Sequence, residues 1–470
     1  MDPHQAGESG RGIARPGANA PASAPDRESG ADRPRPTLRS RDAVAITIGI
    51  VVGAGIFRTP SVIAGAAGSE AAMLAAWAAG GLLSIVGALC YAELAAAYPH
   101  AGGDYHFLGR AFGRRVAFLY AWARLAVIQT GSIALLAFVF GDYAARLAGS
   151  GPSASPAFAA LAVVVLTAIN WAGIRKAAGT QNWLTMIELL GLGLVIVAGL
   201  AIAPADPVAP AAPVATNIGL IMVFVLLTFG GWSEAAYISA ELRDVRRRIA
   251  LVMVGSLALV TLLYLLANLA YLRVLGLGGL AASETVAAEL LDRAFGAPGV
   301  LLMSALVAVA TLTSANATLL TGARSAYALG EAHPPLAWLG RWNSRTGTPG
   351  TAVLVQGAAA LLLVAIGSLT RDGFETAVAF TAPVFWFFFL LVGVSLFVLR
   401  LRDPAAPRPF RVPLFPLLPL IFCATTLYLL YSSVAYTGFG ALFGIIVLIA
   451  GVVPMLAMEL RDRQAGRRGP

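Results

Sequence analysis

The sequence predicts an all-α integral membrane protein with twelve transmembrane helices. Of its 470 residues, 58% are hydrophobic and only 12% are charged, and the mean hydropathy is +0.77. A soluble domain has about 25% charged residues. Apolar stretches of about 18 to 25 residues recur along the chain, and each is long enough to cross a hydrocarbon core about 30 Å thick.

The twelve apolar stretches are predicted to be transmembrane helices. They must be helices, because irregular backbone exposed to lipid would leave amide groups without hydrogen-bond partners. The predicted spans cover residues 43–66, 71–97, 116–146, 157–173, 183–203, 217–240, 249–272, 298–328, 350–368, 374–399, 412–432 and 439–459.

Hydrophilic segments flank these spans at both ends. Residues 1–41 hold 12 of the 57 charged residues together with many Pro, Gly, Ala and Ser, which predicts a disordered cytoplasmic tail. They lack the apolar core of a signal peptide, so the first span is expected to be a retained helix. Residues 461–470 form the predicted cytoplasmic C-terminal tail.

The basic residues predict the orientation of the chain. With the N-terminus inside, 27 of the 33 Lys and Arg residues fall on inside segments, five fall on outside segments, and Arg124 lies within a span. Short cytoplasmic loops collect Lys and Arg, so both termini are predicted to lie in the cytoplasm and the protein in the inner (plasma) membrane. The net charge of +9 therefore reflects orientation, and no nucleic-acid partner is predicted.

Several classes of chemistry are not indicated. Cys90 and Cys423 lie in apolar runs, so no disulfide framework or thiolate metal site is predicted. The histidines fall outside the apolar runs, which argues against an intramembrane metalloprotease. The chain contains no nucleotide-binding phosphate loop. We therefore expect no enzymatic activity, no cofactor and no metal.

Two spans carry glycines at their middles, where a straight helix least needs them. The first reads Gly53-Ala54-Gly55 and the sixth reads Gly230-Gly231. Glycine costs a helix interior about 1 kcal/mol relative to alanine, so both clusters are candidate breaks. Their positions match if spans 1–5 and 6–10 are two copies of one unit, the second being inverted in the membrane. Such matched interruptions indicate a transporter site at the bilayer midplane.

The chemistry of a broken helix suits a ligand with two opposite charges. The N-terminus of a half-helix presents free N–H groups to a carboxylate, and its C-terminus presents carbonyls to an ammonium group or cation. An α-amino acid carries both groups. The alternative interpretation is that these glycines only allow two helices to pack closely.

A series of motifs resembles the amino acid–polyamine–organocation permeases, and within them the L-type amino acid transporter branch. The resemblance extends over about residues 42 to 460, and its specificity comes from the order of the motifs, since each one alone is weak. The motifs are Gly53-Ala54-Gly55-Ile56-Phe57, Pro99 with Gly102-Gly103-Asp104-Tyr105, Gly230-Gly231-Trp232 with Glu241-Leu242-Arg243, Tyr264 with Asn268-Leu269-Ala270-Tyr271, and Ser314-Ala315-Asn316 through Gly322-Ala323-Arg324.

The resemblance implies the leucine-transporter fold and transport by alternating access. That fold is a 5+5 inverted repeat with broken helices 1 and 6. Helices 1–6 would cover residues 42–240, helices 6–10 would cover residues 217–400, and helices 11 and 12 would cover residues 401–460.

The resemblance also implies a set of substrate-binding residues. Backbone groups of Gly53, Ala54 and Gly55 would hold the substrate carboxylate. Carbonyls around Phe229 and Gly230 would hold its amine. The full set comprises Val51, Gly53, Ala54, Gly55, Ile56, Leu227, Phe229, Gly230, Gly231 and Trp232, with Val51 and Leu227 lining the side-chain pocket.

The sequence departs from the family pattern at the gating aromatic. Many members carry an aromatic gate one turn before the helix-six glycines, but here that stretch reads Val225-Leu226-Leu227. Phe229, Trp232 and Phe57 are the substitutes that we consider.

The second departure concerns ion coupling. Many relatives have a lysine in helix five where this sequence has Glu188. We hypothesise that Glu188 takes part in proton coupling, and its alternative is an ion pair with Arg124. Glu234 either faces the cavity or bonds to nearby serine or backbone. Ser314 and Asn316 complete the coupling candidates, and hydrogen bonding between helices is their alternative.

The function predicted from these features is secondary active transport of amino acids, by proton coupling or by exchange. The expected partners are an amino acid substrate, protons and membrane lipid. Alternatives are a polyamine or organic-cation carrier, a channel, and a nutrient sensor without transport. The sequence leaves open which amino acid is carried and the oligomeric state.

Overall fold

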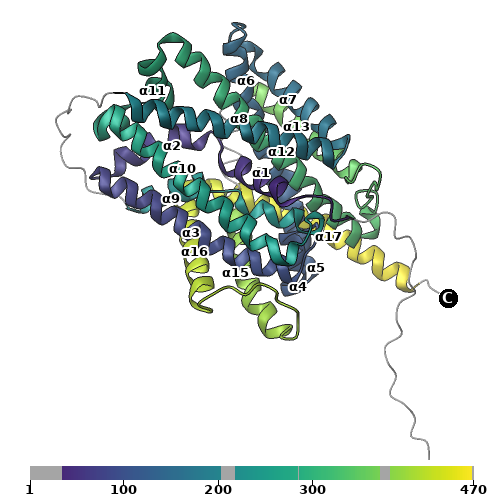
Figure 1. The fold of residues 1–470 in the computed structure, drawn as a ribbon. Helices are drawn as coiled ribbons and strands as arrows, with labels where there is room; N and C mark the ends of the chain where they lie inside the picture. Colours follow the sequence, from purple (N-terminus) through teal and green to yellow (C-terminus); the bar gives the residue numbers. More distant parts are fainter. Residues whose placement is uncertain (1–33, 203–217, 284, 371–381, 468–470) are drawn as a thin grey trace, which may run out of the picture.

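The computed structural model describes residues 34–202, 218–283, 285–370 and 382–467. Regular secondary structure in these ranges is helical, apart from two isolated β-bridges, Leu38–Leu242 and Asn343–Thr348. The helices form one bundle (Figure 1). The prediction of an all-α protein is therefore confirmed for the part of the chain that the structure describes.

The α-helices follow one another along the chain with short connections. A π-helical turn, Arg124–Ile128, joins α5 to α6, and a 3₁₀ stretch, η3 (Trp232–Glu241), follows α9. The α-helices are α1 (Ser40–Val51), α2 (Gly55–Ala66), α3 (Glu70–Ala97), α4 (Asp104–Phe112), α5 (Arg114–Ala123), α6 (Gln129–Leu147), α7 (Ser155–Trp171), α8 (Ile174–Ala201), α9 (Ile218–Thr228), α10 (Val245–Ala282), α11 (Val286–Phe295), α12 (Ala297–Ala332), α13 (Gly350–Leu369), α15 (Ala382–Arg402), α16 (Leu417–Thr437) and α17 (Ala441–Arg467).

Many of these helices are suited to a membrane. Among the described residues, ten helical segments are long and apolar enough to cross one, and an eleventh is counted if α1 and α2 form one bent span. One of the ten, Leu417–Leu460, contains α16 and most of α17, which correspond to the predicted eleventh and twelfth spans. Residues 374–381, the start of the predicted tenth span, lie outside the described residues. The exact number of twelve stays a prediction.

The first span is broken at its glycine cluster. α1 ends at Val51 and α2 begins at Gly55, and the two helices meet at an angle of 44°. The Gly53 amide donates a hydrogen bond to the Val51 carbonyl at 2.9 Å, which closes a tight turn between the two helices.

The sixth span is broken at its own glycine pair. α9 ends at Thr228, and Gly231 has a φ of +99°, in the left-handed region that glycine adopts without strain. A Cβ atom on Gly231 would lie 2.2 Å from the Ile50 side chain of α1, closer than any real contact. The two breaks therefore touch each other, and the absence of a side chain at Gly231 allows that approach.

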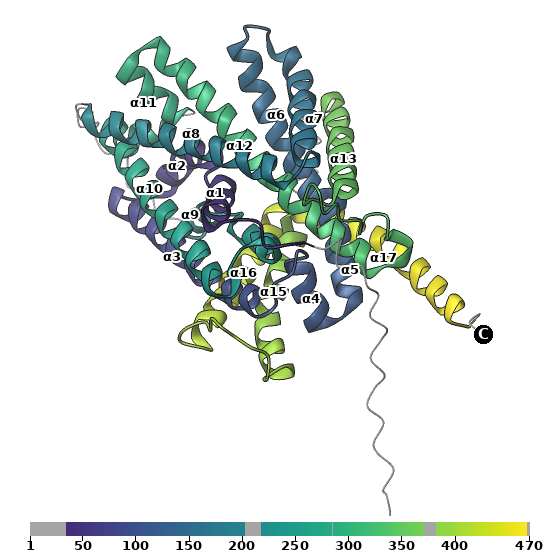
Figure 2. The same ribbon diagram turned by 45° about the vertical axis from the view of Figure 1, so that its right-hand side comes forward.

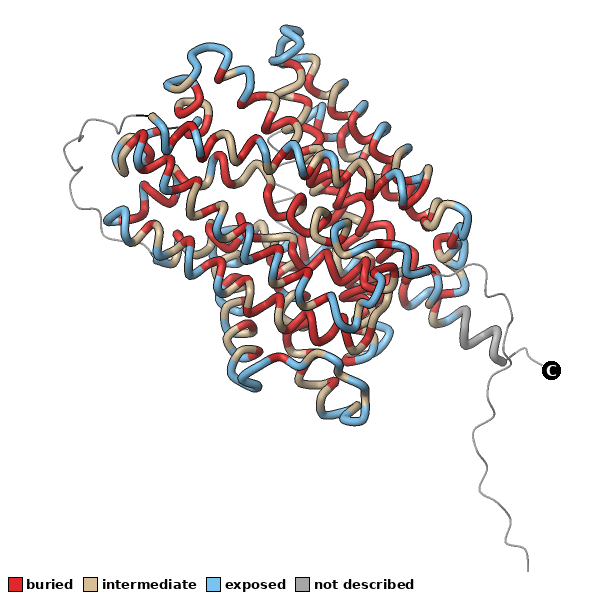
Figure 3. Tube along the Cα trace, in the orientation of Figure 1, coloured by how far each residue is buried: buried red, intermediate tan, exposed pale blue. Residues whose placement is uncertain are grey.

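The remaining helices pack around these breaks. α10 lies along α3 and α8, and α12 lies along α6 and α8 (Figures 1 and 2). Buried residues concentrate on the central helices, and exposed residues line the outside of the bundle (Figure 3). Many exposed residues are large and apolar, such as Leu251 and Leu420, as expected for a surface in contact with lipid.

The described chain makes tertiary contacts before the predicted boundary at residue 41. The Leu38 amide donates to the Glu241 carbonyl at 2.9 Å, the Arg243 amide donates to the Leu38 carbonyl at 3.0 Å, and the Leu38 side chain is buried. The predicted disordered tail of residues 1–41 therefore ends too late, because composition does not reveal this single bridge to the end of η3. Residues 1–33 lie outside the described residues. At the other terminus α17 continues to Arg467, past the predicted boundary at residue 460.

Two ion pairs hold the end of the bundle that is predicted to face the cytoplasm. Arg324 of α12 and Glu241 of η3 are both buried and form a bidentate pair, with one Nη2–Oε2 distance of 2.8 Å. Glu93 of α3 accepts hydrogen bonds from Arg400 at 2.5 and 2.8 Å and from the Val412 amide at 2.7 Å. These contacts tie α12 to η3 and α15 to α3 at one end of the molecule.

Candidate functional site

A cavity of about 530 Å³ lies between the two broken helices. Its volume is within the range of roughly 300–1,000 Å³ that small-molecule sites occupy. Its walls come from both breaks and from α6, α12 and α15. The lining residues are Ile50, Val51, Gly53, Ala54, Gly55, Arg124, Ile128, Gln129, Ser132, Leu135, Leu136, Leu227, Thr228, Gly230, Gly231, Ser233, Glu234, Ser314, Thr318, Ala382, Phe385 and Trp386.

Free backbone N–H groups border this cavity at the start of α2. Among the described residues, no acceptor takes the amides of Ala54 and Gly55, which line the cavity, or of Ile56 behind them, because the first turn of a helix lacks internal partners. The partial positive charge of the helix N-terminus adds to these donors. This edge of the cavity suits a carboxylate.

Free carbonyl groups border the cavity at the second break. No donor among the described residues reaches the carbonyls of Phe229 and Gly230, which follow the last turn of α9, and of these two residues Gly230 lines the cavity. The neighbouring Thr228 carbonyl accepts a long hydrogen bond from the Tyr264 hydroxyl, at 3.4 Å. The Tyr264 hydroxyl also donates to the Val51 carbonyl at 2.8 Å, so one side chain of α10 supports both breaks.

The glycines of the first break allow the start of α2 to lie close to the end of α9 and to α12. A Cβ atom on Gly55 would lie 3.2 Å from the Thr228 methyl group, which is a tight contact. A Cβ atom on Gly53 would lie 3.4 Å from the Ser314 hydroxyl. Larger side chains at Gly55 would therefore fill the space between α2 and the end of α9.

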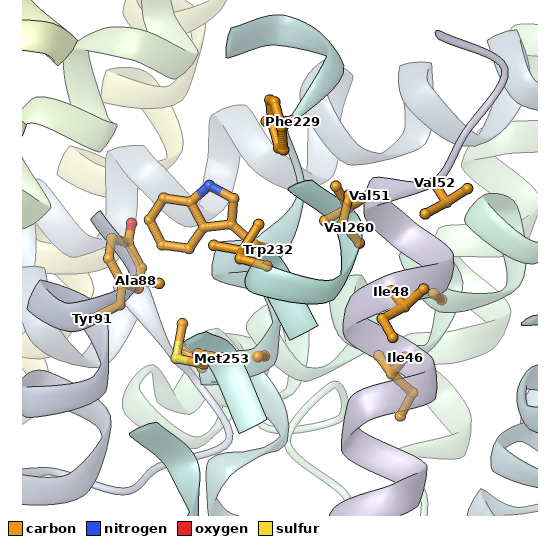
Figure 4. Close-up of a cluster of buried hydrophobic side chains, with 14 of the residues drawn as sticks. Ile46, Ile48, Val51, Val52, Ala88, Tyr91, Phe229, Trp232, Met253 and Val260 are labelled. Atoms are coloured by element: carbon orange, nitrogen blue, oxygen red, sulfur yellow. The ribbon is translucent and has the colours of Figure 1, made fainter. Parts of the chain in front are cut away.

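The predicted substrate-binding residues fall into two groups. Seven of them line the cavity: Val51, Gly53, Ala54, Gly55, Leu227, Gly230 and Gly231. The side chains of Ile56, Phe229 and Trp232 do not. Phe229 packs against Trp77 and Tyr264, with ring centroids 6.1 and 5.0 Å apart. The Trp232 ring lies edge-on to Tyr91 at 5.1 Å, within the buried apolar cluster (Figure 4).

Aromatic side chains reach the cavity from a helix that the sequence did not single out. Phe385 and Trp386 of α15 line its wall. In the sequence they belong to a run of aromatic residues, Phe385 to Phe389, that is more typical of packing or lipid contact. Of the three residues considered as gate substitutes, Phe57 lines a different cavity, described below, and Phe229 and Trp232 are buried.

The polar wall of the cavity is an ion pair between α5–α6 and η3. Arg124, the first residue of the π-helical turn, donates from Nη2 to Glu234 Oε2 at 2.5 Å. Its Nη1 donates to the Tyr120 hydroxyl at 3.2 Å, and its guanidinium lies 4.1 Å from the centre of the Tyr237 ring. The suggested pairing of Arg124 with Glu188 is therefore wrong. Glu234 pairs with a cation, in place of the serine or backbone partner considered from the sequence.

The ion pair continues into a hydrogen-bond network that reaches α4. The Tyr120 hydroxyl bonds to the Tyr237 hydroxyl and donates to Asp104 Oδ2 at 3.1 Å, and the Tyr91 hydroxyl donates to the same oxygen at 3.3 Å. Burial raises the pKa of the Asp104 carboxyl from 3.8 to about 7. The wall of the cavity is thus connected to the short helix after α3.

The remaining coupling candidates occupy different places. Ser314 lines the cavity and donates to the Gly49 carbonyl at 3.0 Å, which ties α12 to α1. Asn316 faces away and bonds to Asn170 and Gln181, each at 2.8 Å. Glu188 is buried outside the cavity lining, and neither of its carboxylate oxygens has a hydrogen-bond partner among the described residues.

A second cavity of about 520 Å³ lies toward the end predicted to face outside. It shares Ala54 and Leu135 with the central cavity, and Phe57, Arg58 and Arg146 are among its other lining residues. The described residues contain no cluster of three His, Cys, Asp or Glu side chains that could hold a metal.

Comparison of the sequence with known proteins finds a matching family model and several related transporters. A family model described as "Amino acid permease" matches residues 38–458. The b(0,+)-type amino acid transporter 1 of Mus musculus is 28% identical over 422 residues, which cover 87% of this chain and 85% of the relative. The Large neutral amino acids transporter small subunit 2 of Homo sapiens is 30% identical over 429 residues, which cover 87% of this chain and 78% of the relative. The resemblance to amino acid–polyamine–organocation permeases is therefore confirmed.

Replacing Gly55 with valine tests the site. The added methyl groups would press against Thr228 and cover the amides at the start of α2. A hydrogen bond to a charged group contributes about 1.5–3 kcal/mol, so the loss of these donors should lower amino acid uptake in proteoliposomes by about tenfold or more. Gly65→Val is the matched control, because Gly65 lies on the same helix with no heavy atom within 4 Å of a Cβ atom there. Uptake by Gly55→Val at the level of Gly65→Val would contradict the proposed position of the substrate.

Replacing Asp104 with asparagine tests the buried network. The pKa of Asp104 is higher in the folded protein than in the unfolded chain, so the folded state binds this proton more tightly. Stability is then lost as the pH rises through about 7. The melting temperature of the wild type, relative to Asp104→Asn, should fall by a few degrees between about pH 5 and pH 8. His100 and His106 are partly buried and burial lowers their pKa values, so they also titrate differently in the folded and unfolded states. Taking the difference between the two proteins cancels that contribution, and a constant difference would contradict the assignment.

Proposed function

Because the chain belongs to the amino acid permease family, we propose that it is a secondary active transporter that carries amino acids across the inner membrane by alternating access. Its relatives are transporters and not enzymes. One observation carries the proposal: the free amides of Ala54 and Gly55 at the start of α2 and the free carbonyl of Gly230 after α9 belong to residues that line the same cavity. An α-amino acid has a carboxylate for the first edge and an ammonium group for the second.

The proposed architecture is twelve spans, built as a 5+5 inverted repeat with both termini in the cytoplasm. The broken helices at matched places in the two halves support the repeat. The separation of α16 from α17 at Gly438–Gly440 supports the last two spans. The 27 basic residues on one side support the orientation.

The state of the two ends supports alternating access. At the inner end, the Leu38–Leu242 bridge and the Arg324–Glu241 pair close the bundle. At the outer end, the second cavity adjoins the central one through Ala54 and Leu135. This arrangement fits an outward-facing stage of the cycle, and transport requires the inner contacts to open in turn.

We assign proton coupling to Glu188. A carboxyl group buried in an apolar span without a partner is costly in its charged form, so such groups are functional candidates. The assignment concerns only how uptake is driven. Exchange between internal and external amino acids needs no net proton movement.

Counterflow in proteoliposomes tests the function directly. Vesicles loaded with unlabelled amino acids should accumulate a labelled amino acid with saturable kinetics, and excess unlabelled substrate should compete. Flux that rises linearly with concentration would indicate a channel, and binding without flux would indicate a sensor. Competition by putrescine or spermidine but by no amino acid would indicate a polyamine carrier. Each of these three results would contradict the proposal.

Replacing Glu188 with glutamine tests the coupling. Glutamine keeps the shape of the side chain but cannot release a proton. We expect Glu188→Gln to keep counterflow and to lose the increase of net uptake at acidic external pH, whereas Glu188→Asp keeps it. Wild-type pH dependence in Glu188→Gln would show that this carboxyl group is not the proton carrier.

A further inference from the structure

The central cavity contains two charged side chains among its described lining residues, Arg124 and Glu234. They are partners, joined by a hydrogen bond of 2.5 Å between Arg124 Nη2 and Glu234 Oε2. Their side chains are only 3% and 11% exposed, so little water screens them. The rest of the lining is apolar side chains, neutral polar side chains and backbone. The described wall therefore carries no net charge.

The cation of this pair is held in place from several sides. Arg124 begins the π-helical turn, a local feature that often marks functional sites. Its guanidinium bonds to the Tyr120 hydroxyl and lies over the Tyr237 ring. Because these groups fix Arg124 at the wall, it neutralises the Glu234 carboxylate at a defined place.

The balance of charge has a consequence for the substrate. The α-carboxylate and α-ammonium groups of an amino acid cancel each other, so an amino acid with a neutral side chain brings no net charge into the cavity. A cationic or anionic side chain would need a countercharge there, because moving an uncompensated charge out of water is costly. Arg124 and Glu234 already neutralise each other, so neither side chain is left to compensate a charge on the substrate.

We propose that the Arg124–Glu234 pair is a charge filter that restricts transport to amino acids with neutral side chains. This inference rests on the proposed function and names its substrate class. The pair is a specificity-determining element, and the backbone groups at the helix breaks bind the substrate whether or not the pair is present. A purely structural pair, which only ties the π-helical turn to η3, would affect transport of all substrates equally.

Single substitutions would unbalance the wall in opposite directions. Arg124→Gln leaves the Glu234 carboxylate without its partner, so the cavity should accept lysine or arginine. Glu234→Gln leaves the Arg124 cation, so the cavity should accept glutamate and reject lysine. The double variant Arg124→Gln/Glu234→Gln removes both charges and should restore the preference for neutral side chains. Arg273→Gln is the control, because it removes an exposed cation that does not line the cavity.

The measurement is the ratio of lysine to leucine counterflow in proteoliposomes, with each rate normalised to correctly folded protein by size-exclusion chromatography. We expect the ratio to rise about tenfold or more in Arg124→Gln, as for other buried charge pairs that lose one partner. It should return to within about twofold of the wild type in the double variant, and Arg273→Gln should match the wild type. If Arg124→Gln does not fold, the test uses Glu234→Gln. We expect its ratio of glutamate to leucine counterflow to rise above that of the wild type.

Three results would overturn the filter. The first is an unchanged ratio in folded Arg124→Gln or Glu234→Gln. The second is a double variant as altered as the singles. The third is wild-type protein that carries lysine as well as leucine. Wild-type protein that carries no amino acid at all would instead contradict the proposed function, so the two failures are distinguishable.

Discussion

The contact between the two helix breaks is the constraint on which the rest of the structure depends. Gly231 lies against Ile50 of α1, and Gly55 lies against Thr228 of α9. Unwound backbone is tolerated at membrane depth only where it is covered by protein or borders a cavity. Here it borders the central cavity, and α10 and α12 support it through Tyr264 and Ser314. In the proposed mechanism the substrate is therefore held mainly by backbone groups.

Most of the buried charged side chains that the structure describes are paired or hydrogen-bonded. Arg324 and Glu241 pair at the inner end, and Arg124 and Glu234 pair at the cavity wall. Asp104 accepts hydrogen bonds from two tyrosine hydroxyls, and one of these tyrosines, Tyr120, connects it to Arg124 at the cavity wall. Of the buried acidic residues that the structure describes, Glu188 is the one with neither carboxylate oxygen bonded. Structural pairing thus accounts for most buried charges, which leaves Glu188 as the group to examine for energy coupling.

The sequence predicted those features that depend on local preference and composition. Apolar stretches of membrane length predicted the helices, and glycine clusters at Gly53–Gly55 and Gly230–Gly231 predicted where two of them break. It did not predict the partner of Arg124, because that contact requires η3 to pack against the π-helical turn. Nor did it predict that Phe385 and Trp386 reach the cavity, since an aromatic run around a whole helix carries no sign of which face turns inward. The bridge at Leu38 is likewise a single tertiary contact.

An experimental structure with a bound amino acid tests the central claim most directly. The account predicts a carboxylate within about 2.7–3.2 Å of the amides of Ala54 and Gly55, and an ammonium group within the same distance of the Phe229 and Gly230 carbonyls. An amino acid bound with its carboxylate on the Arg124 guanidinium, or only in the outer cavity beside Arg58, would contradict it.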